Sequence, residues 1–383
     1  MKENWTYKKL TDVCDIQYGY PFDSACFSTS PDEGMPLIRI RDVKDGHTST
    51  YFKGDYPKEY IIHKGDYLVG MDGEFNIAPW KSEDALLNQR VCKVASKSTD
   101  VSMGFLYRFL IKELKKIEDE TPFVTVKHLS AKRLNQVYLN IPTLSEQNRI
   151  VSELDLLQSI IDKQQAQLKE LDKLAQAVFY DMFGDPVENE KGWGLMTMED
   201  VCLNIVDCSH STPKKSDRIT NYPCIRTSEL KEGSIYWDSM QYLEEDEYII
   251  RIARLKPIAG DIVFGREGTI GDAVILPNGY NFSLGQRTML LRVDGSSISN
   301  IFLQRVILSE CVKKQIRMVN VSSTVPHVNI KDFKQFEIPV PPLSLQQSFA
   351  AKIESIEKQK TAISQSIAET QKLFDYTMDK YFG

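Results

Sequence analysis

One segment decides the fold: residues 141–184 read IPTLSEQNRIVSELDLLQSIIDKQQAQLKELDKLAQAVFYDMFG. After Ile141-Pro142, apolar side chains recur in alternating steps of four and three residues, which is the spacing of a coiled-coil seam. The seam positions are Ile150, Leu154, Leu157, Ile161, Gln164, Leu168, Leu171, Ala175, Val178 and Met182. A helix over these positions rises about 50 Å and cannot bury its apolar stripe without a partner.

A second long helix is predicted at the end of the chain, over residues 343–383, with the same spacing. Its seam positions are Phe349, Ile353, Ile356, Lys360, Ile363, Ile367, Thr370, Phe374, Thr377 and Tyr381. Gln164 in the first seam and Lys360 in the second are polar, and such residues cost stability but can fix register. The two helices could pack separately into their own domains, but the matching seams favour pairing with each other.

The helices belong to a tandem repeat. Residues 125–128, Thr-Val-Lys-His, return as residues 324–327, Thr-Val-Pro-His, and 14 of 60 positions are identical between 125–184 and 324–383. Unrelated sequences would share about four. Upstream, Gln89-Arg90 matches Gln286-Arg287 at a slightly different offset, as expected where loops differ in length. A period near 190 residues is too long for a solenoid, so each unit is a domain.

The expected fold class is α+β. Residues 1–143 and 185–342 contain short strand-like runs between Gly, Pro and Asn turns, which predicts two globular domains of mixed helix and strand. Residues 144–184 and 343–383 are the two long helices. If these pair in antiparallel fashion as an intramolecular coiled coil, the chain is a pseudo-twofold dimer within one molecule.

Composition limits the class of protein. The chain has 383 residues, of which 42% are apolar and 26% are charged, which suits a soluble globular protein with two to three cores. No signal peptide or membrane span is apparent, so we expect a cytoplasmic protein. The net charge is −6 and no segment is a basic tail, so any nucleic-acid surface must be local. Seven cysteines without a Cys-x-x-Cys pair indicate buried thiols.

The globular domains carry no recognisable catalytic constellation. The five histidines lack metal-binding spacing, and residues 265–271 are glycine-rich but lack the spacing of a phosphate-binding loop, which favours tight turns. One enzymatic alternative stays open: Asp32 together with Glu113 and Lys115 could hold a divalent metal in a nuclease site. The pattern otherwise favours a binding protein.

The order of motifs resembles the specificity subunit of type I restriction-modification systems. The resemblance rests on residues 141–147 and 340–347, which open the two helices, on the turn at 183–186, and on the two Thr-Val-x-His segments. Each motif is short, but their duplicated order covers essentially the whole chain.

This resemblance implies a noncatalytic DNA-binding subunit with two target recognition domains, at 1–143 and 185–342, separated by conserved helices at 144–184 and 343–383. Each domain would read one half of a split double-stranded target. In the family, two methyltransferase subunits methylate adenine in the half-sites, and restriction subunits cut unmodified DNA as an antiphage defence. The resemblance places S-adenosylmethionine, ATP and Mg on those partner subunits and no cofactor or metal on this chain.

Candidate DNA-binding residues follow from side-chain chemistry, since Arg is the commonest bidentate partner of guanine and Lys suits phosphate. The candidates are Arg39, Arg41, Lys44 and Tyr20 in the first domain, and Arg226, His210, Lys214, Lys215 and Arg266 in the second. The charged ones could equally be solvated surface residues, and Tyr20 could fill a core. His128 and His327 occur in both halves, which favours a scaffold or docking role.

Two other functions stay open. A stand-alone DNA-binding regulator would bind its target without a methyltransferase, and the nuclease would cut DNA with a divalent metal.

Overall fold

The computed structural model describes residues 5–122, 127–320 and 326–383. Thr125, Val126, Thr324 and Val325 of the repeated motif lie outside these residues. Contacts divide the chain into two units: unit 1 comprises Met1–Gln165 and Gln365–Gly383, and unit 2 comprises Ala166–Ser364. Each long helix contributes to both units, and the division into four segments by residue number stays a prediction. Among the described residues, every helix falls short of the length and apolarity needed to cross a membrane.

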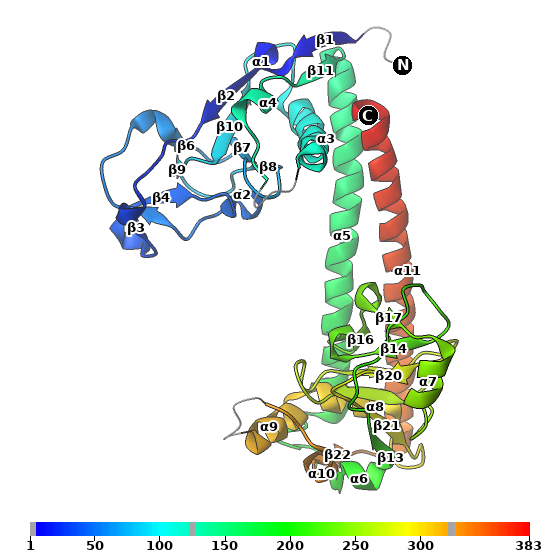
Figure 1. Cartoon of the computed structure of the whole chain (residues 1–383). Coiled ribbons are helices and arrows are strands. Elements are labelled where there is room, and N and C mark those ends of the chain that lie inside the picture. The colour runs from blue at the N-terminus through cyan, green and yellow to red at the C-terminus, as the bar shows by residue number, and fades with distance from the viewer. Residues whose placement is uncertain (1–4, 123–126, 321–325) are drawn as a thin grey trace. The chain divides into compact units, whose positions relative to one another are not determined.

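The described residues of unit 1 form three small sheets and four α-helices in addition to the long ones (Figure 1). The four-stranded sheet has the order β2 (Cys14–Tyr18), β10 (Val91–Ser96), β7 (Tyr67–Gly70), β8 (Asn76–Pro79). The five-stranded sheet has the order β3 (Phe27–Ser28), β5 (Tyr51–Phe52), β4 (Met35–Ile38), β9 (Ala85–Leu87), β6 (Ile61–Ile62). The third pairs β1 (Thr6–Lys9) with β11 (Tyr138–Ile141), and the helices are α1 (Leu10–Val13), α2 (Asp42–Asp45), α3 (Met103–Glu120) and α4 (Ala131–Leu134).

Unit 2 has a closely corresponding set of elements. Its four-stranded sheet has the order β13 (Cys202–Asp207), β21 (Thr288–Val293), β18 (Ile262–Gly265), β19 (Ala273–Ile275). The smaller sheets are β17 (Gln241–Tyr242), β14 (Pro223–Ile225), β20 (Ser283–Leu284); β15 (Leu230–Lys231), β16 (Ser234–Ile235); and β12 (Gly194–Thr197), β22 (Glu337–Val340). The shorter helices are α6 (Met198–Val201), α7 (Glu245–Arg251), α8 (Asn300–Leu308), α9 (Glu310–Val319) and α10 (Ile330–Lys334).

The sheet topology shows the repeat directly. The order β2-β10-β7-β8 in unit 1 corresponds to β13-β21-β18-β19 in unit 2, and the pair β1-β11 corresponds to β12-β22. Each unit also joins two of its strands in parallel, β4 with β9 and β14 with β20. The α+β fold expected from the sequence is therefore confirmed, and it occurs twice.

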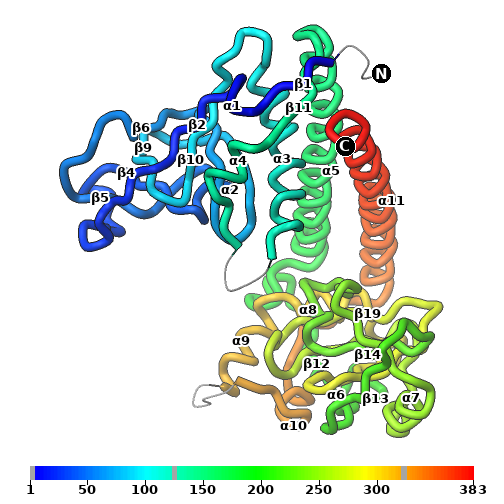
Figure 2. The backbone as a smooth tube through the Cα atoms, turned by 45° about the horizontal axis from the view of Figure 1, so that its top comes forward, coloured from blue at the N-terminus to red at the C-terminus, as the bar shows by residue number. Residues whose placement is uncertain are grey.

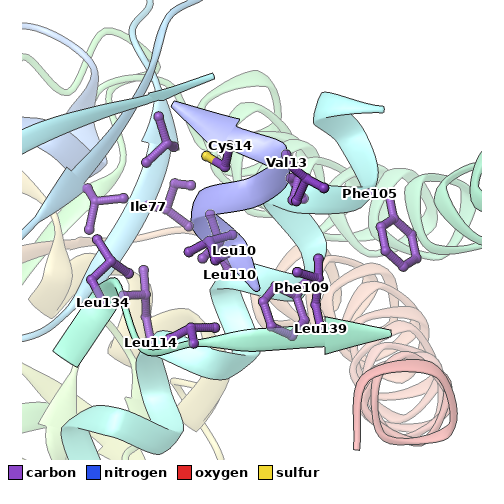
Figure 3. Packing of buried hydrophobic residues seen from close by; sticks show 14 of the residues in the cluster. Leu10, Val13, Cys14, Ile77, Phe105, Phe109, Leu110, Leu114, Leu134 and Leu139 are labelled. Atoms are coloured by element: carbon purple, nitrogen blue, oxygen red, sulfur yellow. The ribbon is translucent and has the colours of Figure 1, made fainter. Parts of the chain in front are cut away.

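The two long helices are α5 (Leu144–Phe183) and α11 (Leu343–Phe382), each of 40 residues. In unit 1 the first half of α5 packs on the domain core: Ile150 and Leu154 are fully buried with Phe105 and Leu110 of α3. Figure 3 shows part of this core, where side chains of α1, α3 and β11 meet. Part of the apolar face of α5 is therefore buried against the domain core of unit 1.

A buried glutamine fixes the start of each long helix. Gln147 is fully buried; its Nε2 donates to the carbonyl oxygens of Pro142 (2.9 Å) and Asp100 (2.7 Å), and its Oε1 accepts from the Ser102 N–H (2.8 Å). Ser102 in turn caps the N-terminus of α3. All polar atoms of the buried amide are satisfied, so the contact orients α5 against α3 at little desolvation cost.

The same clamp recurs in unit 2. The fully buried Gln346 donates to the carbonyl oxygens of Pro341 (2.8 Å) and Ser297 (3.0 Å) and accepts from the N–H of Ser299, the N-cap of α8. Gln147 and Gln346 occupy corresponding positions of the repeat, 199 residues apart, and this identity is therefore structural. It ties each long helix to the N-terminus of a domain helix, α3 in unit 1 and α8 in unit 2.

The long helices also contact each other within each unit, and the order of contacts is antiparallel. In unit 1, the Arg149 guanidinium donates to Tyr381 Oη (3.0 Å), and Gln164 Nε2 donates to Ser366 Oγ (2.7 Å). Figures 1 and 2 both show the end of α11 beside the start of α5. The expected pairing is thus present, together with the packing of each helix on its own domain.

In unit 2 the pairing continues with an ionic and an aromatic contact. Lys360 Nζ lies 2.8 Å from an oxygen of Asp172 on α5. Burial disfavours the charged form of Lys360, but Asp172 and Glu357 favour it and raise the pKa of Lys360. Phe183 packs on Phe349 with ring centroids 5.2 Å apart. The polar seam residue Lys360 therefore has a charged partner on the facing helix.

Most of the predicted seam residues are buried. Leu157, Ile161 and Leu171 of α5 and Ile353 and Ile356 of α11 are at most 9% exposed. The partly buried seam positions are Gln164, Leu168, Val178, Met182, Lys360, Ile363, Ile367, Thr370 and Phe374.

Near the end of α5 the buried face departs from the seam. Phe179 and Phe183 are buried, whereas the predicted Val178 and Met182 are only partly so. The reason is a third partner, since Phe183 also packs on Phe302 of α8, with ring centroids 4.7 Å apart. The strict seam spacing therefore gives way where the helix also faces its domain.

The seven cysteines are free thiols, and five of them are buried. Burial raises the pKa of Cys14 and of Cys224 to about 11, so both are protonated at neutral pH. The remaining buried thiols are Cys92, Cys208 and Cys311. These residues pack as small apolar groups.

We expect Gln147→Leu to lower the free energy of unfolding by about 3 kcal/mol, because it leaves the buried Pro142 carbonyl and the part-buried Asp100 carbonyl and Ser102 N–H without their partner. Gln346→Leu should have a similar effect. Gln158→Leu is the matched control, since the Gln158 amide contacts only the exposed Asp162 on the same helix. Urea unfolding of the purified chain measures the difference, and equal stability of Gln147→Leu and Gln158→Leu would contradict the clamp.

Candidate nucleic-acid interface

Tyr20 lies at the start of the loop after β2, and its backbone is hydrogen-bonded to the segment that precedes β10. Its N–H donates to the Leu87 carbonyl (2.9 Å) and its carbonyl accepts from the Gln89 N–H (2.9 Å). Gly19 permits this approach, because a Cβ there would lie 2.0 Å from the Asn88 carbonyl oxygen. The Tyr20 ring is 38% exposed and contacts Phe22 and Tyr60. Tyr20 is therefore an exposed aromatic residue on a fixed backbone.

The other candidates of the first half lie around helix α2. Arg39 and Arg41 are exposed; the Arg39 N–H donates to the Asp42 carboxylate (2.7 Å), and the Arg41 Nε lies 3.6 Å from it. Lys44 pairs with Glu74 in the β7–β8 turn, and both side chains are more than half exposed. The exposed Lys44–Glu74 pair contributes little to stability, and the Arg39 and Arg41 side chains are themselves exposed, so these three cations are accessible to a ligand.

Arg226 has a different environment. Its guanidinium donates to both oxygens of Glu229 (2.6 and 3.2 Å) and to the Ser239 carbonyl (2.9 Å). Glu229 is fully buried, and it also accepts from the hydroxyls of Ser228 and Ser239. Arg226 thus neutralises a buried carboxylate, a structural role the sequence did not indicate. Its assignment to DNA is an untested prediction.

Arg266 and His210 share one acid, Asp207. The Arg266 guanidinium, only 11% exposed, lies 2.5 Å from Asp207 Oδ2, and the His210 Nε2 lies 3.2 Å from the same oxygen. His210 is 70% exposed, and its carbonyl accepts from Gln286 Nε2 (2.6 Å). Of the two, His210 is the residue on the surface, and Arg266 supports the loop beneath it.

Lys214 and Lys215 follow His210 on the same exposed loop. Lys215 forms an isolated bridge with Leu243, which fixes the backbone of this segment beside β17. The structure thus gathers His210, Lys214 and Lys215 on one loop of unit 2, and Tyr20 on the corresponding loop of unit 1. The two loops differ in sequence.

Sequence reasoning missed one repeated cluster. In unit 1, the Arg90 Nε lies 3.5 Å from Asp72, and the His128 Nδ1 lies 2.5 Å from the same carboxylate. In unit 2, the Arg287 Nε lies 3.1 Å from Glu267, whose backbone forms an isolated β-bridge with His327, as that of Asp72 does with His128 in unit 1. The Gln-Arg identity at an offset of 197 was the available signal.

The nuclease alternative finds little geometric support. Asp32 lies in a short 3₁₀ turn, while Glu113 and Lys115 lie on α3, where Lys115 pairs with Asp119 (2.9 Å). Over residues 5–122, 127–320 and 326–383, no three His, Cys, Asp or Glu side chains are grouped to hold a metal ion.

Comparison with known proteins points to one family. Residues 2–173 and 190–371 match the type I restriction modification DNA specificity domain. The chain is 29% identical to the EcoBI specificity subunit of Escherichia coli, covering 99% of this chain and 86% of the relative. It is 22% identical to the MjaVIII specificity subunit of Methanocaldococcus jannaschii, covering 93% and 86%.

Solved structures share the fold. The S subunit of a type I restriction-modification system from M. genitalium superposes with a TM-score of 0.58 at 13% identity, covering 99% of this chain and 96% of that one. A chain from a structure of a type I R-M system gives a TM-score of 0.55 at 16% identity, covering 99% and 98%.

We expect Arg226→Ala to lower the free energy of unfolding by about 3 kcal/mol, because it leaves the buried Glu229 carboxylate without its cation. Arg41→Ala removes an exposed arginine and should change stability by less than about 0.5 kcal/mol. Thermal or urea unfolding of the two variants measures the contrast. A stable Arg226→Ala protein with weakened DNA binding would instead make Arg226 a DNA contact.

Proposed function

The chain belongs to the type I restriction modification DNA specificity family, and on that premise we propose that it reads a two-part DNA target for partner enzymes. The observation that carries the proposal is the duplication of one domain whose scaffold recurs while its exposed loops diverge. Both copies match the family, over residues 2–173 and 190–371.

The division between constant and variable parts supports reading of two different half-sites. The buried clamps of Gln147 and Gln346 are the same in both units. The loops at Tyr20 and His210, in contrast, have unlike side chains at corresponding places beside Gln89 and Gln286. Base-reading residues must differ between half-sites, whereas the scaffold need not.

Linking two DNA-binding domains in one chain also increases the free energy by which the target is distinguished from other sites. One domain that contacts a few base pairs discriminates by about 1–3 kcal/mol for each pair, which is too little against a genome of competing sites. Linking two such domains makes the second contact intramolecular and nearly adds their free energies. A bipartite target follows from the duplicated chain.

The reaction itself belongs to partners in this proposal. We infer that the chain is noncatalytic and acts in the cytoplasm with two methyltransferase subunits, which carry S-adenosylmethionine, and with restriction subunits, which use ATP and Mg. Exposed apolar side chains on the long helices support docking of protein partners there: Leu156 is 62% exposed, Leu373 52% and Tyr376 66%.

Deleting the gene from its host should abolish adenine methylation at one two-part sequence, and restoring the intact chain should restore it. Genome-wide mapping of modified adenines makes the measurement and also reveals the target. Methylation that persists in the deletion strain would reject the proposal. Tight footprinting by the purified chain, with no methylation in either strain, would favour a stand-alone regulator.

The paired helices are expected to set the spacing of the half-sites. Inserting one heptad between Leu157 and Leu168 of α5, with a matching heptad between Ile363 and Phe374 of α11, keeps the seam in phase. Seven residues add about 10 Å, or about three base pairs of spacer. Methylation mapping should show unchanged half-sites with a longer spacer. Altered half-sites at the original spacing would contradict this role of the helices.

A further inference from the structure

We propose that Arg90 and Arg287 are matched anchors for the DNA phosphate backbone, one beside each half-site reader. The proposal rests on the function proposed above and goes beyond it by naming a sequence-independent contact. Its starting point is the cluster that recurs in both units: an arginine, an acid and a histidine brought together from three separate segments.

The backbone geometry of the cluster is conserved between the units. In unit 1 the Arg90 carbonyl accepts from the Met71 N–H (2.9 Å), and the Met71 carbonyl accepts from the Leu129 N–H (2.7 Å). In unit 2 the Arg287 carbonyl accepts from the Arg266 N–H (2.9 Å), and the Arg266 carbonyl accepts from the Val328 N–H (2.9 Å). The same three segments therefore present the arginine in the same way.

Both arginines have a backbone conformation that disfavours a side chain. Their φ angles are +74° and +67°, and within the described residues only Asn189 and Glu232 share this property among residues other than glycine. Glycine would fit these positions with less strain. Arginine at both strained positions indicates that its side chain is needed, since strain of this kind gathers at functional sites.

The ion pairs of these arginines do not explain their presence. The Arg90 and Arg287 side chains are 55% and 63% exposed, and pairs at such exposure contribute little to stability. Another ion pair of unit 2 shows the contrast: Arg292 lies 2.7 Å from Asp261, which is 2% exposed and also accepts from the Ile258 N–H (2.8 Å). The buried pair serves the fold, whereas the exposed pair is free to exchange its acid for another anion.

The closeness of each arginine to a loop that differs between the units indicates which anion would replace its acid. The residue before each arginine bonds to the divergent loop: the Gln89 N–H to the Tyr20 carbonyl (2.9 Å), and Gln286 Nε2 to the His210 carbonyl (2.6 Å). In each unit the ligand would contact a loop that differs between the units and an arginine that is the same in both. Such a ligand needs one part that varies and one part that is constant. DNA has both, as bases and phosphates, and arginine binds phosphate in a bidentate manner.

The test uses the full chain assembled with its methyltransferase subunits, and the variants Arg90→Gly and Arg287→Gly. Affinity for a duplex that carries the mapped target is measured over a range of salt concentrations. Each variant should reduce the slope of log K against log salt by about 0.9, and the double variant by about 1.8, because each loses one phosphate contact. The thermal midpoint should stay the same or rise, since glycine relieves the strain, and the methylated sequence should not change.

Arg133→Ala and Arg317→Ala are matched controls. Both are exposed, ion-paired arginines, with Glu120 and Glu310, and neither has an arginine counterpart in the other repeat. Their salt slopes should equal that of the unaltered complex. A reduction as large as in the glycine variants would make the effect one of bulk charge and overturn the proposal.

Three further outcomes would overturn it. Unchanged slopes in the glycine variants would exclude phosphate contacts, and an altered half-site would make the arginine a base reader. If a glycine variant assembled poorly with the methyltransferase subunits, and the complex that did form kept the unaltered salt slope, the cluster would contact a partner protein instead of DNA. Failure of the proposed function is separate, because the unaltered complex would then bind no two-part target.

Discussion

The clamp formed by one buried glutamine in each unit is the constraint on which the structure depends. Gln147 and Gln346 are fully buried, and each bonds to the N–H of a domain helix's N-cap residue and to two carbonyl groups. A long amphipathic helix has no stable orientation by itself, because its stripe can be buried in several ways. The directional bonds of a buried amide select one orientation, and the apolar contacts of Phe105 and Phe302 then stabilise it.

Features that recur in both units are mostly buried, whereas features that differ between the units are exposed. The repeated clamps, sheet orders and seams are largely buried, while the loops around Tyr20 and His210 are exposed and unlike. This distribution suits a protein that keeps one scaffold and changes what it reads. Arg90 and Arg287 are repeated although they are exposed, and we propose that a constant feature of the ligand accounts for this.

Features of local sequence could be predicted, and features set by distant partners could not. The spacing of apolar residues predicted both long helices and the seam through Ile161 and Ile353, because periodicity is a local property. The shift of the buried face to Phe179 and Phe183 depends on α8, far along the chain.

The candidate site shows the same limit. Composition singles out arginines, but it does not show which are already neutralised by an acid: the partner of Arg266 is Asp207, brought near by the pairing of β13 with β21 and β18 with β21. The positive φ of Arg90 and Arg287 is likewise a tertiary property. The candidates Arg39, Arg41, Lys44, Lys214 and Lys215 are exposed, and they stay predictions.

Exchange of one domain tests the central claim most directly. A chain that carries residues 1–143 in place of residues 185–342, with both long helices retained, should direct methylation to a target made of the first half-site twice in inverted order. Mapping of modified adenines reads the result. Methylation at the original asymmetric target, or at unrelated sequences, would contradict the view that each copy of the domain reads its own half-site.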